Sequence, residues 1–71
     1  MDTNRYADLV NMYANNVYKI AVSYCNNRSD AEDIVQETFL KLWQIREKLD
    51  GYNSVEALAV QVAKMAYKGG N

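Results

Sequence analysis

The sequence predicts an all-α protein, a small three-helix bundle in a single domain over residues 1–71. Proline is absent, and the glycines Gly51, Gly69 and Gly70 all fall late in the chain, so long helices are permitted before them. Apolar residues recur at steps of three and four, which is the period of a helix face rather than of a strand. Because a chain this short buries only a small core, self-association is an open way to complete it.

The first helix is predicted from Thr3 to Cys25. Its apolar positions share one face of a helix and are Tyr6, Leu9, Val10, Tyr13, Val17, Ile20, Ala21 and Tyr24. Asn26 and Asn27 tolerate left-handed backbone conformations, so we expect them to end this helix.

The second helix is predicted from Ser29 to about Lys48, before the turn "LDGYNS". Ser29 and Glu32 have the spacing of a capping box, in which each side chain bonds a backbone N–H of the other residue. The expected buried face consists of Ala31, Ile34, Val35, Thr38, Leu42 and Ile45.

Ser54 is expected to cap a third helix that contains "EALAVQVAKMA". This stretch is apolar on more than one side, with Ala57, Leu58, Val60, Val62, Ala63 and Met65. We therefore expect it to lie buried between other elements or against a partner.

The composition excludes several classes of function. The chain has no histidine and one cysteine, Cys25, so we expect no disulfide, no metal site and no histidine-based catalysis. We expect no enzyme and no cofactor. No apolar run approaches the ~18 residues of a transmembrane helix, and the first residues show no secretory signal, which favours a cytoplasmic protein without a membrane anchor.

A second, polar stripe is predicted on the second helix. Asp33, Gln36, Glu37 and Leu40 fall on one line at 3.6 residues per turn, and Trp43 or Gln44 extends it by a further turn. Acids in the first turn suit the helix dipole, but this explains neither Gln36 nor Glu37. An acidic and amide start with an apolar end would suit a partner helix that carries arginines beside an aliphatic ridge.

The alternative is an ordinary solvated helix face. In that interpretation Phe39 and Trp43, which are four residues apart, pack against the first or the third helix.

The segment "DAEDIVQETFLKLW" resembles the most characteristic part of region 2 of bacterial sigma factors of the extracytoplasmic-function (ECF) group. "LVNMYANNVYKIAVSYCNNRSDAED" is similar to the leading helix and loop of that family, and "KLWQIREKLDGYNS" to its continuation into region 2.3. The resemblance covers most of residues 5 to 64.

This resemblance implies a sigma region 2-like bundle that docks on the clamp helices, a coiled coil of the RNA polymerase β′ subunit. Asp33, Gln36 and Glu37 would provide the polar contacts, and Leu40 and Trp43 the apolar ones. These are the residues of the stripe predicted from helical spacing.

The resemblance also implies a contribution to recognition of the promoter −10 element. The family tends to have R-I-A-x-N in its last helix, and this chain has Gln61 and Met65 where the arginine and the asparagine would stand. Tyr52, as a platform for bases, and Lys64, as a phosphate contact, are the candidate DNA-binding residues. Packing is favoured for Tyr67 and a solvated rim for Lys68.

The family would continue its last helix beyond "AYKGGN" and add a domain that reads the −35 element, and we expect this chain to lack both. An anti-sigma protein and a second copy of the chain are further candidate partners. The competing hypothesis is therefore a helical self-association or interaction module that keeps the sigma-like fold without promoter binding.

Overall fold

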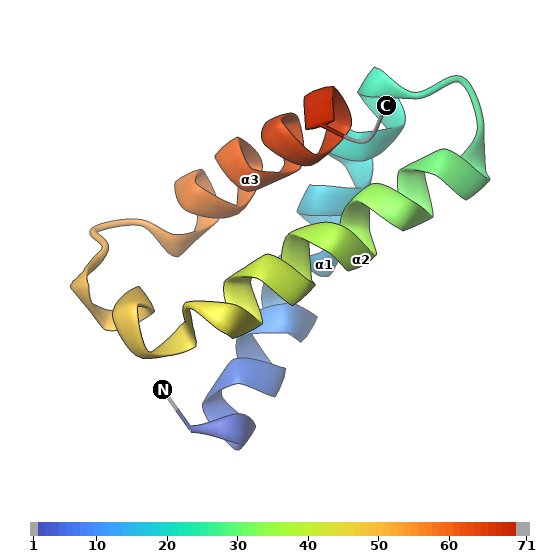
Figure 1. Cartoon of the computed structure of the whole chain (residues 1–71). Helices are drawn as coiled ribbons and strands as arrows, with labels where there is room; N and C mark the ends of the chain where they lie inside the picture. The colour runs from blue at the N-terminus through green and yellow to red at the C-terminus, as the bar shows by residue number, and fades with distance from the viewer. Residues whose placement is uncertain (1, 70–71) are drawn as a thin grey trace.

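The structure is a computed structural model that describes the backbone of residues 2–69 and the side chains of residues 2–67. The described residues form three α-helices, α1 (Thr3–Tyr24), α2 (Arg28–Gln44) and α3 (Val55–Gly69), with a short 3₁₀ helix, η1 (Arg46–Gly51), between α2 and α3. Each α-helix packs against the other two (Figure 1). The predicted all-α, three-helix architecture is confirmed.

The core lies where the three helices meet. Thr38 is fully buried in α2, and its hydroxyl donates a hydrogen bond to the Ile34 carbonyl at 2.7 Å, so its burial leaves no polar group unpaired. The buried apolar residues are Tyr6, Leu9, Val17 and Ala21 in α1, Ala31, Ile34 and Leu42 in α2, Leu49 in η1, and Ala59, Val62, Ala63 and Ala66 in α3.

The start of α2 corrects the predicted capping box. The N-cap is Asn27, not Ser29: the Asn27 Oδ1 accepts from the backbone N–H of Asp30 at 2.8 Å, and its Nδ2 donates to the Asp30 carboxylate at 3.0 Å. An Asn side chain both accepts and donates, so it forms a reciprocal pair with Asp30 and lets the helix begin earlier. Glu32 pairs instead with Arg28 at 3.3 Å.

The end of α1 also differs from the expectation. The helix stops at Tyr24, and Cys25 has an extended backbone with φ −116° and ψ 150°. The Cys25 N–H still bonds the Ala21 carbonyl at 3.1 Å, which satisfies the last turn. No residue other than glycine has positive φ in the described part of the chain, so Asn26 and Asn27 do not use the left-handed conformation expected of them.

α2 ends at Gln44, before the predicted end near Lys48. The chain then tightens into η1, whose narrower turn directs Leu49 into the core, where it is 1% exposed. The predicted cap of α3 is confirmed, because the Ser54 hydroxyl accepts from the Ala57 N–H at 3.1 Å.

Candidate functional site

The outward side of α2 carries the predicted stripe. α2 packs against α1 and α3 through Ala31, Ile34, Thr38 and Leu42, which turns the opposite side of the helix to solvent (Figure 1). The stripe residues Asp33, Gln36 and Glu37 are exposed, and Leu40 is 52% exposed.

The carboxylates of the stripe form no close contacts with cations in the part of the chain that the structure describes. Among the described residues, neither Asp33 nor Glu37 is part of an ion pair or a side-chain hydrogen bond. Leu40 adds an apolar side chain next to them, and a single exposed leucine is common on protein surfaces. The distinctive feature is the combination of unpaired carboxylates, an amide and an apolar end on one helix face.

Trp43 lies at the C-terminal end of this face and is half-buried. The Tyr6 ring of α1 meets its indole edge to face, with centroids 5.0 Å apart and planes at 68°. The Arg46 guanidinium carbon lies 3.9 Å from the centroid of the Trp43 ring, and Arg46 Nη1 donates to the Trp43 carbonyl at 3.0 Å. The Tyr6 hydroxyl donates to the carbonyl of Phe39.

Phe39 and Trp43 both pack against the core, as the alternative interpretation of this helix expects. Trp43 therefore contributes to the bundle, while its role as a binding residue stays a prediction. The sequence interpretation missed Tyr6 and Arg46 as its neighbours. Arg46, three residues after Trp43, had a local signal in that spacing; Tyr6 had none, because only the packing of α1 on α2 brings it there.

The two candidate DNA-binding residues are exposed but lie apart. Tyr52 follows η1 directly and is 46% exposed. Lys64 is exposed on α3, nine residues after the first residue of that helix, Val55, which corresponds to ~14 Å along its axis.

Tyr67 is 43% exposed and stacks on Tyr24 of α1, with ring centroids 5.3 Å apart and planes at 25°. This contact agrees with the packing role favoured for Tyr67. The side chain of Lys68 lies outside the described residues.

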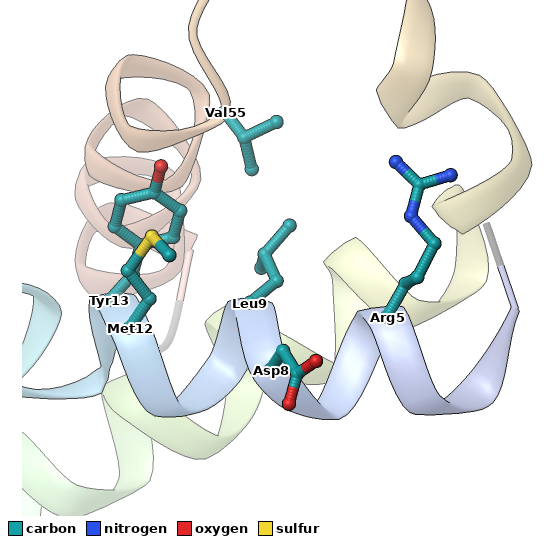
Figure 2. Close-up of a pocket in the computed structure, with 6 residues that line it drawn as sticks. All are labelled: Arg5, Asp8, Leu9, Met12, Tyr13 and Val55. Atoms are coloured by element: carbon teal, nitrogen blue, oxygen red, sulfur yellow. The ribbon is translucent and has the colours of Figure 1, made fainter.

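A shallow groove of about 250 Å³ lies between α1 and the start of α3 (Figure 2). Figure 2 shows Leu9 and Val55 approaching each other across it, while Arg5 points toward η1, where it pairs with Asp50 at 3.6 Å. Its walls are mainly apolar, and the lining residues are Arg5, Asp8, Leu9, Met12, Tyr13 and Val55.

Burial shifts two titratable groups. It raises the pKa of the Tyr6 phenol, whose hydroxyl is held against the Phe39 carbonyl. Burial, and secondarily the Asp30 carboxylate, raise the pKa of the Cys25 thiol, so this lone cysteine is a neutral thiol at pH 7. No group of acidic, cysteine or histidine residues in the described part of the chain could hold a metal ion.

Comparison with protein-family models finds a match to sigma-70 region 2 over residues 9–68. The chain belongs to the sigma-70 region 2 family. The matched segment runs from α1 into α3 and contains the whole α2 stripe. Comparisons with curated proteins and with solved structures returned no significant match.

Membership in this family has two consequences. Sigma region 2 is non-enzymatic, so the domain is not an enzyme, as predicted. It implies a sigma-factor role in transcription initiation and binding to core RNA polymerase. In residues 2–69, moreover, no helix is long and apolar enough to cross a membrane.

Proposed function

We propose that this chain is region 2 of an ECF-group sigma factor and that the outward face of α2 docks on the clamp helices of the β′ subunit. The observation that carries the proposal is the exposure of Asp33, Gln36, Glu37 and Leu40 along one side of a helix whose other side forms the core. Bacterial RNA polymerase acts in the cytoplasm, and the domain is proposed to act there with it.

The chemistry of this face fits a basic coiled coil. The Asp33 and Glu37 carboxylates accept charge-assisted hydrogen bonds from arginine, and the Gln36 amide both donates and accepts. Leu40 and the exposed part of Trp43 then meet an aliphatic ridge. Opposite charges of this kind raise the association rate and fix the register more than they add to the affinity.

We propose a second, weaker role for Tyr52 and Lys64 at the −10 element. An exposed tyrosine ring can stack on an unpaired base, and a lysine can neutralise a phosphate. Gln61 and Met65 stand where the family tends to have arginine and asparagine, so α3 offers fewer DNA contacts than is usual. The domain is therefore expected to bind DNA only when RNA polymerase holds the domain and the promoter together.

The polymerase contact is tested by measuring the affinity of the chain for a β′ clamp-helix fragment. Gln36→Ala combined with Glu37→Ala is expected to weaken binding by at least about 30-fold, since removing one partner of a desolvated charged contact costs about 2–5 kcal/mol. The matched control is Gln61→Ala combined with Glu56→Ala, which removes the same two side-chain types from exposed positions on α3.

Equal affinities for all three proteins would overturn the proposal. If the wild-type chain does not bind the fragment and sediments as a stable dimer, the result would favour the self-association module instead. The exposed apolar side chains available to such a dimer include Met12 on α1 and Met65 on α3, which are 67% and 62% exposed.

A further inference from the structure

Trp43 is the one stripe residue that the bundle itself holds in place. We infer that Arg46 is a positioning residue for polymerase binding: together with Tyr6 it fixes the Trp43 indole as the rigid apolar end of the docking face. This inference rests on the proposed function, and it assigns to Arg46 a role that acts through Trp43 rather than through direct contact with the partner.

The geometry around the indole leaves it little freedom. The Arg46 guanidinium covers one face of the ring at 3.9 Å, and the Tyr6 ring approaches from α1 with centroids 5.0 Å apart. Tyr6 is in turn anchored, because its hydroxyl donates to the Phe39 carbonyl of the same helix that carries Trp43. The indole is thus held by one residue of α1 and one residue of η1.

Arg46 also stabilises the backbone beneath the ring. α2 ends at Gln44, and the last carbonyls of a helix have no N–H partner within it. Arg46 Nη1 donates to the Trp43 carbonyl at 3.0 Å, so the same guanidinium fixes both the main chain and the side chain of Trp43. This bond adds to the backbone N–H of Ile45, which closes the last turn of α2 on the Lys41 and Leu42 carbonyls.

A fixed indole matters because a partner must otherwise order it on binding. Immobilising a side chain that is free before association reduces the affinity, and preorganisation removes that cost. Large aromatic anchors held in this way commonly dominate helix-in-groove contacts. Arg46 is therefore expected to affect the affinity for polymerase even though its guanidinium is turned onto Trp43.

Trp43 is the single tryptophan of the chain, so its fluorescence reports the indole directly. In the full chain, Arg46→Gln is expected to increase the local motion of Trp43 in time-resolved anisotropy and to weaken binding to the β′ clamp-helix fragment about tenfold. Arg46→Lys keeps the charge without the planar stacking group and is expected to fall between. The matched control is Lys48→Gln, which removes an exposed cation from the same 3₁₀ helix and is expected to change neither measurement.

A double-mutant cycle separates positioning from general stability. In a Trp43→Leu background, Arg46→Gln is expected to reduce the affinity much less than in the wild-type chain, because only the bond to the carbonyl of residue 43 is left to lose. If Arg46→Gln does not fold, Arg46→Lys provides the test of Arg46. Tyr6→Phe then tests the second contact of the ring, since it removes the hydrogen bond to Phe39 and keeps the aromatic contact.

Two results would overturn the inference alone. One is a folded Arg46→Gln chain that binds with wild-type affinity, and the other is an equal loss of affinity on Arg46→Gln with and without the Trp43 indole. If, in the first case, the Gln36 and Glu37 variant still loses binding, the positioning role fails and the proposed function stands. If the wild-type chain does not bind the fragment at all, the proposed function and the positioning role are both overturned.

Discussion

The two helices α2 and α3 divide their residues differently between core and surface. α2 buries the large side chains Ile34 and Leu42 on one side and presents a polar, acidic stripe on the other. α3 fills its part of the core mainly with Ala59, Ala63 and Ala66 and leaves the large Met65 exposed. The comparison teaches that the size of an apolar residue does not indicate whether it is buried, whereas its position around the helix does.

The largest expected effect lies in the core of α2. Leu42→Ala removes a fully buried side chain and leaves a cavity, which is expected to lower the free energy of unfolding by about 2–5 kcal/mol. Such a loss is a large part of the stability of a small domain. Urea unfolding followed by circular dichroism measures it.

The control for Leu42→Ala lies on the outer side of α3. Met65→Ala shortens a side chain that is 62% exposed, and we expect a change within about 0.5 kcal/mol. If the two substitutions destabilise the protein equally, the division between α2 and α3 described above is wrong, and Met65 is covered by a partner or a second copy.

An intermediate effect is expected at the start of α2. Asn27→Ala removes the side chain that bonds the Asp30 N–H at 2.8 Å, and this is expected to cost about 1 kcal/mol of stability in urea unfolding. Ser29→Ala is expected to change the stability by less than about 0.5 kcal/mol, since Ser29 already lies inside the helix. A larger loss of stability for Ser29→Ala than for Asn27→Ala would support the capping box predicted from the sequence.

The smallest effect is a pH dependence at the contact between α1 and α2. Because burial raises the pKa of Tyr6, the unfolded chain, with a tyrosine pKa of about 10, loses this proton at lower pH than the folded chain. Tyr6 therefore contributes its full stability below about pH 10, and this contribution falls as pH rises toward the folded-state pKa.

Tyr6→Phe is expected to remove the part of the stability loss at alkaline pH that comes from ionisation of the Tyr6 phenol. The measurement is the urea midpoint of both proteins over a series of pH values from about 8 to 11. Parallel curves would mean that the Tyr6 phenol is equally solvated in the folded and unfolded states, contrary to its position between Phe39 and Trp43.

Much of this domain follows from local pattern. The spans of α1 and α3, the Ser54 cap and the exposed line Asp33, Gln36 and Glu37 agree with the structure within a few residues. These features depend on helical periodicity and on hydrogen bonds between neighbouring residues, and both can be predicted from short stretches of sequence.

The choice between competing local signals was less predictable. Asn27 and Ser29 are both good N-caps, and the spacing to Glu32 favoured the wrong one. The end of α2 was likewise placed too late, because the helical pattern continues to Lys48 although the backbone tightens after Gln44. The tighter backbone accompanies the burial of Leu49 in the core, which is a tertiary feature and has no signal in the helical pattern.

The sequence by itself determined the three helices and the direction in which α2 turns its acidic side, because each follows from contacts within one or two turns. Only the tertiary structure decided that Tyr6 lies against Trp43, whereas Arg46 has a local signal in its spacing of three residues. The Tyr6 contact depends on how α1 packs on α2 in space, and no local pattern specifies that packing.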